Sequence, residues 1–172
     1  MALLNIHTFP DPILRKKALP VTEFNQNLDD TTQSMLETMY VSSGIGLAAI
    51  QAGILKRIVV IDLKSGEEDI SLRDPHVFVN PKILNKYGST VSEEGCLSVI
   101  DFRGDIDRAE NITVEYQDVK GNLHQMEAEE MMSICLQHEI DHLNGILFID
   151  HLPALKQKMV KKKLTKLAMA NA

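Results

Sequence analysis

The spacing of apolar residues along this 172-residue chain alternates between the period of a helix and that of a strand. Helical spacing predicts helices over residues 26–41, over 128–144 and from Pro153 to about 170. β-Branched or alternating residues predict strands over 57–63, 76–84 (interrupted at Pro81), 111–116 and 122–127. The segment 44–51 has too many glycines for a helix and is too apolar for an exposed loop. Since no repeat or linker divides the chain, we expect one domain over residues 1–172.

The segment 128–144 predicts a buried helix, because its side chains are apolar around most of the circumference. Acidic residues stand near its first turn, where the helix dipole favours anions, and Gly145 follows as a stop signal. His138 and His142 continue one of its apolar stripes. We therefore expect both imidazoles to face the interior.

Charge is distributed unevenly along the chain, whose net charge is −6. Residues 151–172 carry six lysines and no acid, whereas residues 1–150 carry all 24 acids and 12 of the 18 basic residues. The acidic body argues against nucleic-acid binding by that part. We expect the basic C-terminal helix to dock on the body through one apolar side, formed by Leu155, Met159, Leu164 and Leu167.

The two cysteines, Cys96 and Cys135, are too few for a disulfide framework. The sequence contains no run of about 18 apolar residues, so it predicts no membrane span. Its first ten residues are too polar, and the segment is too short, to be a signal peptide. We therefore expect a cytoplasmic protein without a membrane or DNA partner, in which a cysteine serves as a ligand, a nucleophile or part of the core.

Residues 138–142 read HEIDH and match the pattern H-E-x-x-H. Histidines four apart share one helix face, with Cβ atoms about 6 Å apart, so both rings can bind one metal ion at roughly 2.0–2.1 Å. Glu139 points beside the ion, where it can take a proton from water. The alternative is a pair of buried histidines satisfied by hydrogen bonds, but their place on an interior stripe favours the metal site.

A catalytic metal site needs a third protein ligand and an open position. The candidates are Cys96, Cys135, His7, His76, His124, His151 and scattered acids. Cys96 follows Gly95, and glycine lets the backbone approach closely, as the wall of a site must. We favour Cys96, with an ordinary buried cysteine as the alternative, and interpret Cys135 as a core thiol because it would crowd the two histidines on their helix.

Three segments together resemble the signature motifs of the peptide deformylases: GIGLAAIQ at 44–51, EGCLS at 94–98 and QHEIDHLNG at 137–145. Their order and spacing agree with the family, and the resemblance extends to about residue 152. It implies an α+β fold in which antiparallel strands pack around the central HExxH-bearing helix. The C-terminal amphipathic helix would follow this catalytic domain.

The resemblance implies a metal-dependent hydrolase that removes the formyl group from the N-terminal formylmethionine of nascent polypeptides and releases formate. Cys96, His138 and His142 would bind Fe(II), for which Zn or Ni can substitute. Glu139 would act as the general base. The Gln51 side-chain amide and the backbone N–H of Leu97 would stabilise the oxyanion.

The resemblance also implies that the substrate binds as an added strand along Ile45, Gly46 and Gly95. Arg103 matches the family arginine near the substrate backbone; a surface ion pair with a nearby aspartate is the alternative. The methionine pocket would be formed by Ile45, Met131, Ile134, Cys135 and His138.

Three positions depart from the usual family pattern. Ile100 stands where a proline is frequent, and Glu130 and Met131 replace a glycine and a leucine. Met131 is a flexible apolar replacement that should still line a pocket, and we expect Glu130 to face solvent. Pocket shape and loop rigidity are therefore the properties that these positions affect.

Two other functions share part of this pattern. An HExxH peptidase usually takes its third ligand from a later residue, and only His151 follows closely. A non-catalytic metal-binding domain would need a fourth protein ligand. The basic tail adds a hypothesis, that the C-terminal helix binds ribosomal RNA through phosphate contacts, against the alternative of a solvated lysine face.

Overall fold

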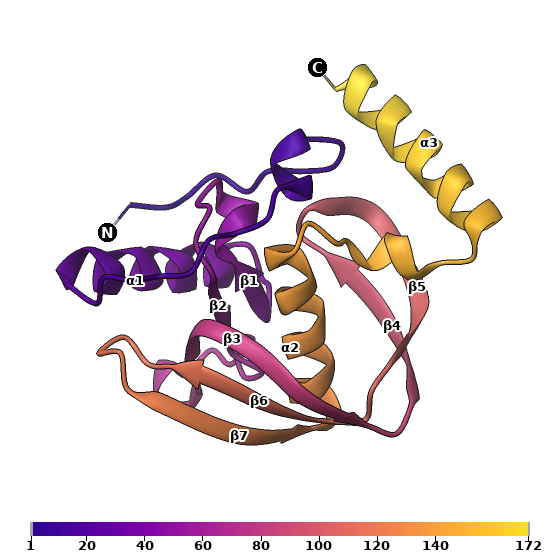
Figure 1. The fold of residues 1–172 in the computed structure, drawn as a ribbon. Helices are drawn as coiled ribbons and strands as arrows, with labels where there is room; N and C mark the ends of the chain where they lie inside the picture. The colour runs from indigo at the N-terminus through magenta and orange to yellow at the C-terminus, as the bar shows by residue number, and fades with distance from the viewer. Residues whose placement is uncertain (1, 172) are drawn as a thin grey trace.

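The computed structural model describes residues 2–171 and contains two antiparallel sheets with a helix between them (Figure 1). The larger sheet has the strand order β1-β2-β3-β6-β7, and its strands are β1 (Gly46–Ala48), β2 (Ile58–Ile61), β3 (His76–Tyr87), β6 (Asn111–Gln117) and β7 (Leu123–Glu129). The smaller sheet pairs β4 (Thr90–Cys96) with β5 (Val99–Arg108). The helices are α1 (Gln26–Val41), α2 (Glu130–Leu143) and α3 (Ala154–Ala170). This arrangement confirms the expected α+β fold, with residues 138–142 on the central helix α2.

Strand β2 holds the core together because it is buried on both faces. Val59 and Ile61 pack in one cluster with Leu136 and Ile140 of α2. Ile58 and Val60 point the other way, into a cluster with Met35, Leu36 and Met39 of α1. Successive side chains of a strand point to opposite faces, so a continuous β-branched run suits a strand covered on both sides.

The predicted helices and strands mostly agree with the structure. Residues 26–41 form α1, and Asn25 caps it by accepting a hydrogen bond from the backbone N–H of Leu28 at 3.2 Å. The helix expected over 128–144 is shorter, because residues up to Glu129 continue strand β7. A single short turn of helix forms at η1 (Pro12–Arg15), with Asp11 accepting from the N–H of Ile13.

One expectation about local structure was wrong, and a segment that the pattern had left without an assigned structure can be assigned. Strand β3 continues through Pro81 to Tyr87, because a bulge between Val79 and Lys82 removes the need for a ladder donor there. The segment 44–51 forms the short strand β1 and then a helical turn, η2 (Ala49–Ala52). Strands β4 and β5 were not predicted at all, since their buried positions include Glu94 and Arg108, which break the apolar alternation.

Helix α3 docks differently from the expectation. Val160 and Leu164 are buried against the body, whereas Leu155 and Met159 are 74% and 65% exposed. A helix turns about 100° per residue, so Leu155 and Met159 lie on the opposite side from Leu164. Lys161 and Gln157 attach the helix to Asp150 and to the carbonyls of Asp150 and Leu152.

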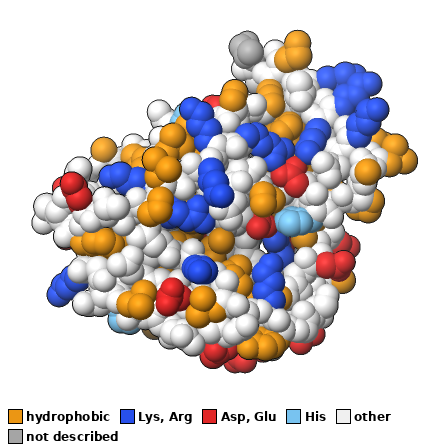
Figure 2. Space-filling model, viewed as in Figure 1, with side chains coloured by type: hydrophobic (Ala, Val, Ile, Leu, Met, Phe, Trp, Pro, Cys, Tyr) orange, Lys and Arg blue, Asp and Glu red, His pale blue; other side chains and the backbone are white. Residues whose placement is uncertain are grey.

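Lys and Arg side chains gather over α3 and over the middle of the face that Figure 2 shows. No helix within residues 2–171 has the length and apolar character needed to cross a membrane.

Candidate active site

Helix α2 and the end of strand β4 bring together three side chains that could bind a metal ion. Single ligand atoms of Cys96, His138 and His142 all lie within 4.8 Å of one another. The Nε2 atom of His142 is 3.3 Å from Cys96 Sγ and 3.2 Å from His138 Nε2. The two histidines therefore share one helix face, as their spacing predicted, and Cys96 joins them from the smaller sheet.

The chemistry of this cluster fits a divalent transition metal. One sulfur and two imidazole nitrogens are ligands that such ions prefer, and three protein ligands leave one position open. Among residues 2–171, only these three His, Cys, Asp or Glu residues meet so closely. His142 is fully buried, and the remaining histidines lie elsewhere, each beside an aspartate: His7 with Asp11, His76 with Asp74, His124 with Asp118 and His151 with Asp141.

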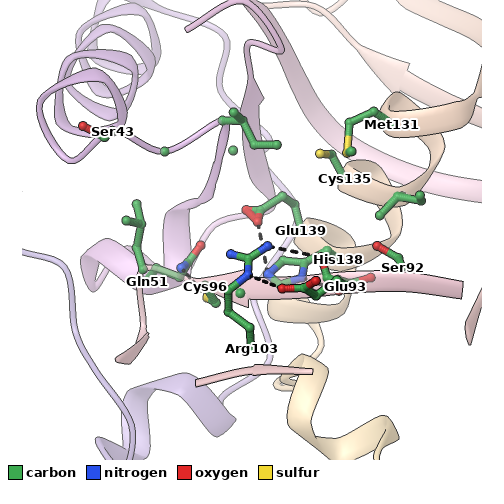
Figure 3. A pocket seen from close by; sticks show the side chains of 17 residues that line it. Ser43, Gln51, Ser92, Glu93, Cys96, Arg103, Met131, Cys135, His138 and Glu139 are labelled. Carbon is green, nitrogen blue, oxygen red and sulfur yellow. Dashed lines mark hydrogen bonds and ion pairs between the residues drawn. The ribbon is translucent and has the colours of Figure 1, made fainter. Parts of the chain in front are cut away.

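Glu139 lies beside the cluster and faces the cavity. Its Oε1 atom is 3.6 Å from His138 Nε2, whereas its buried Oε2 has no hydrogen-bond partner (Figure 3). Burial raises the pKa of Glu139 to about 7. A carboxylate with one unoccupied oxygen and such a pKa is suited to accept a proton from a molecule that enters the cavity.

The Gln51 amide is held in a fixed orientation at the edge of the cluster. Its Oε1 accepts a hydrogen bond from the backbone N–H of Ala48 at 2.9 Å. Its Nε2 donates to Ser98 Oγ at 3.0 Å and lies 3.4 Å from Cys96 Sγ. The side chain therefore presents N–H groups toward the cluster and its oxygen away from it.

Behind the cluster lies a buried ion-pair network that the sequence analysis missed. Glu94 accepts a hydrogen bond from His138 Nδ1 at 2.8 Å and two from Arg108, also at 2.8 Å. Although burial opposes ionisation, these donors hold the pKa of Glu94 down to about 2. The resulting carboxylate orients the His138 ring, so that Nε2 faces the cluster. The signal in the sequence was Glu94 itself, inside the EGCLS motif.

A cavity of about 450 Å³ opens on this cluster (Figure 3). It is lined by all seven residues expected to bind substrate, namely Ile45, Gly46, Gly95, Arg103, Met131, Ile134 and Cys135, and by Gln51, Leu97, His138 and Glu139. Ser43, Gly44, Ser92, Glu93 and Glu94 also line it and were not predicted. Burial raises the pKa of the Cys135 thiol to about 12. The thiol therefore stays protonated and lines the cavity as an uncharged side chain.

Arg103 lies across the cavity mouth on strand β5. Its Nε donates to Glu93 Oε1 at 3.0 Å, so the pair forms with Glu93 and not with a neighbouring aspartate. A Cβ atom at position 95 would stand 2.5 Å from Arg103 Nη1, so the glycine lets the guanidinium lie directly over this strand. Both members of the ion pair are more than 60% exposed, at 62% and 66%. Such a pair is weak and leaves the guanidinium free to bind another acceptor.

The departures from the family pattern can also be located. Met131 is 49% exposed and lines the cavity, and Glu130 is exposed as expected. Glu130 has a φ of +52°, a left-handed conformation that favours glycine. Ile100 is exposed next to Asp101, whose φ is +60°.

Comparisons with known proteins all point to one family. Residues 3–158 match the family described as Polypeptide deformylase. A peptide deformylase from Alkalilimnicola ehrlichii is 47% identical over 97% of this chain and 92% of its own length. Peptide deformylase 1 from Shewanella oneidensis is 46% identical over 100% of this chain and 99% of its own length.

Solved structures show the same relationship. A peptide deformylase from Legionella pneumophila superposes with a TM-score of 0.88 at 40% identity, over 99% of this chain and 98% of that one. The Synechococcus elongatus enzyme, solved in complex with actinonin, gives a TM-score of 0.86 at 39% identity, over 93% and 86% of the two chains. The chain therefore belongs to the peptide deformylase family, metal-dependent hydrolases that remove the N-terminal formyl group from nascent peptides.

Proposed function

We propose that the cavity beside α2 is the deformylase active site of this chain and that residues 1–172 form one catalytic domain. The observation that carries the proposal is the meeting of Cys96, His138 and His142 next to a buried carboxylate oxygen of Glu139 without a partner. A closed structural metal site would need a fourth protein ligand, and the cluster within residues 2–171 has three.

The metal proposed for the cell is Fe(II), with Zn or Ni as substitutes in preparations. Cys96, His138 and His142 would hold it, and Glu94 would keep the His138 ring in place through Nδ1. When bound, such an ion polarises a carbonyl group and lowers the pKa of water. A thiolate ligand is soft, which suits a first-row transition metal better than Mg²⁺ or Ca²⁺.

Glu139 is proposed to hold and move the proton. It accepts a proton from the attacking water and delivers it to the leaving amine, while its burial keeps the proton inside the site. The Gln51 N–H groups face the cluster and would donate to the developing oxyanion together with the backbone N–H of Leu97. Because Gln51 is fixed by Ala48 and Ser98, these donors need little reorganisation during the reaction.

The formylmethionyl peptide is proposed to lie between the two sheets. Strand β1 is an edge strand of the larger sheet. Gly46 of β1 and Ile45, just before it, line one side of the cavity, and Gly95 of β4 also lines it. Main-chain hydrogen bonds to such edges tolerate varied sequences. The methionine side chain would enter between Met131, Ile134, Cys135 and His138, and Arg103 would contact the peptide backbone.

The proposed setting is the cytoplasm, where the substrate emerges from the ribosome. The lysines of α3 are proposed to contact ribosomal RNA phosphates. Lys162, Lys163 and Lys166 of α3 are exposed whereas Val160 and Leu164 are buried, so these lysines are available to a partner while the helix stays docked. No DNA or membrane partner is proposed.

Formate release from a formyl-Met-Ala-Ser peptide tests the activity. Glu139→Gln should keep near-normal metal content and lose at least ~100-fold in rate, since it removes the acid–base group. Glu129→Gln, which changes an exposed carboxylate just before the same helix, is the matched control and should retain full rate. A Glu139→Gln rate within threefold of wild type, or cleavage of internal bonds in unformylated peptides, would contradict the proposal.

A further inference from the structure

His151 was a candidate metal ligand in the sequence. It lies near the proposed site, but the proposed function gives it no role. It stands at the end of the helical turn η4 (Phe148–His151), and its side chain is 38% exposed. Its Nε2 atom is 2.9 Å from Asp141 Oδ2 and does not reach the Cys96, His138 and His142 cluster.

His151 is nevertheless the outer end of an uninterrupted chain of hydrogen bonds to that cluster. Asp141 Oδ2 also accepts from Arg108 Nη1 at 2.7 Å. Arg108 donates through Nε and Nη2 to Glu94, and Glu94 Oε1 accepts from His138 Nδ1 at 2.8 Å. Four side-chain contacts thus connect a surface imidazole to a buried one, and Arg108 Nη1 also lies 3.5 Å from His151 Nε2 itself.

Charges alternate along this chain in a way that makes Arg108 the shared member. Its guanidinium is 4% exposed and serves two carboxylates at once, Glu94 on one edge and Asp141 on the other. Asp141 Oδ2 lies 2.7 Å from Arg108 Nη1 and 2.9 Å from His151 Nε2, so both donors meet at one carboxylate oxygen. Two donors therefore stabilise the Asp141 carboxylate. If one donor is removed, the carboxylate interacts with the other donor alone.

We propose that His151 is a positioning residue for the metal site, acting through Asp141 and Arg108 on the carboxylate that orients His138. The inference rests on the proposed function, because it concerns the metal ligands assigned there. Asp141 accepts only, so His151 must carry a proton on Nε2 to bond it. Without that donor, the Arg108 guanidinium shifts toward Asp141, and its hydrogen bonds to Glu94 become weaker.

The same helical turn contacts His138 by a second route, which the experiment must hold constant. The Phe148 ring stacks on the His138 ring, with centroids 5.9 Å apart and an interplanar angle of 24°. Phe148 is 1% exposed and belongs to the core cluster that also contains Val160 and Leu164 of α3. Substitutions at His151 leave this packing in place because its side chain points to the surface and Asp141.

The test compares His151→Phe with His151→Gln in the full chain. Phenylalanine keeps the ring but has no donor, whereas the glutamine amide can donate to Asp141 from a similar position. Loss of an outer partner of a ligating histidine typically weakens metal binding roughly 10–100-fold, and for this more distant partner we expect about three- to tenfold. Zn(II) affinity would be measured at pH 7 by competition with a chromogenic chelator.

A spectroscopic readout separates positioning from a general loss of stability. The visible bands of the Co(II)-loaded protein report the geometry at Cys96, His138 and His142, and they should shift in His151→Phe and return in His151→Gln. His124→Phe is the matched control, because His124 also pairs with an aspartate, Asp118 at 2.8 Å, far from the cluster in the β6–β7 hairpin.

The outcomes distinguish this inference from the proposed function. Weaker Zn(II) binding and shifted Co(II) bands in His151→Phe alone support it. Zn(II) affinity within twofold of wild type, tighter binding, or an equal change in His124→Phe would overturn it while the metal site stands. Failure of the wild-type chain to bind Zn(II) or Co(II) at the cluster would overturn the proposed metal site, and this inference with it.

Discussion

Gly46 lies directly against the side chain of Glu139. A Cβ atom at position 46 would stand 3.2 Å from Glu139 Cγ and 3.3 Å from Cδ, closer than side chains normally approach. Glu139 is 4% exposed, so its carboxylate cannot move into solvent to make room. The glycine of strand β1 therefore leaves the space that the proposed general base occupies.

Gly46→Ala should move Glu139 within the cavity and reduce kcat/KM for formate release roughly 10- to 100-fold, the effect expected for misplacing a catalytic group by a fraction of an ångström to one ångström. Metal content should stay near normal, since the three atoms nearest to the new methyl group all belong to Glu139, which is not one of the proposed ligands. Gly66→Ala is the control, because a Cβ there meets nothing within 4 Å. Unchanged kcat/KM in Gly46→Ala would show that Glu139 tolerates the methyl group.

The sequence predicts the members of the site better than it predicts what supports them. His138 and His142 follow from helical spacing, Cys96 follows from its place after Gly95 and from its motif, and Gln51 follows from the resemblance of its motif to a family. The pairing of Arg108 with Glu94 could not be predicted, because it joins two strands that the pattern did not reveal. Buried charges interrupt the apolar alternation by which a strand is recognised.

Helix α3 shows a similar limit. Its existence followed from spacing, but the side that docks did not, because both Leu155 with Met159 and Val160 with Leu164 offer an apolar pair. The choice is made by the body, where Lys161 meets Asp150 and where Val160 finds an apolar cluster. Tertiary contacts of this kind leave no local trace in the sequence.

The backbone of Glu130 is strained, and a single substitution should remove this strain. Its φ of +52° is unfavourable for a residue with a Cβ, and the exposed side chain makes no hydrogen bond that would compensate within the described chain. Glu130→Gly should therefore raise the free energy of unfolding by about 1 kcal/mol. Urea denaturation followed by circular dichroism measures this change.

Glu129→Gly provides the opposite case at the neighbouring position. Glu129 has a φ of −133°, which any residue adopts, so glycine there adds only flexibility to the unfolded chain. It should lower the free energy of unfolding by roughly 0.5–1 kcal/mol. Destabilisation by both substitutions would mean that position 130 stores no strain.

Asp150 should make stability depend on acid pH. Burial opposes its ionisation, but Arg15, Lys161 and the backbone N–H of Leu147 hold its pKa down to about 2, against an ordinary value of 3.8. A lowered folded-state pKa contributes stability that is present above pH 4 and is lost as the pH falls through about 2. Asp150→Asn should thus cost about 1–2 kcal/mol at pH 6 and almost nothing near pH 2.

Thermal or urea unfolding of both proteins from pH 6 to pH 2 measures that difference. The gap between wild type and Asp150→Asn should close progressively below pH 4. A gap that stays constant over this range would assign the loss to packing of the turn η4 and not to the charge of Asp150.

The two cysteines should separate a ligand from a wall residue. Cys96→Ser should reduce Zn(II) content or weaken its binding, because a hydroxyl is a harder and much less readily ionised ligand than a thiol. Cys135→Ser should keep the metal and lower the melting temperature, since Cys135 is 7% exposed among apolar side chains. Elemental analysis after gel filtration measures the metal content of both variants. If Cys135→Ser loses the metal and Cys96→Ser retains it, the ligand assignment is wrong.

The lysines of α3 should matter for ribosome binding and not for catalysis. Lys162, Lys163 and Lys166 are exposed, whereas Lys161 pairs with Asp150 at 2.9 Å and helps to attach the helix, so it is left unchanged. Replacing the three exposed lysines with Gln should abolish co-sedimentation with ribosomes at low salt. Wild-type binding should weaken steeply as salt rises, because phosphate contacts release counterions.

A charge-matched control replaces Lys56, Lys64 and Lys120 with Gln, three exposed lysines of the body. This control should still co-sediment. Both triple variants should release formate from a short formyl-peptide at the wild-type rate, since none of the six lysines lines the cavity. If the α3 variant co-sediments like wild type, or if salt leaves binding unchanged, the lysines of α3 are a solvated face. Equal loss in both variants would instead indicate attraction through net charge, without a specific role for the helix.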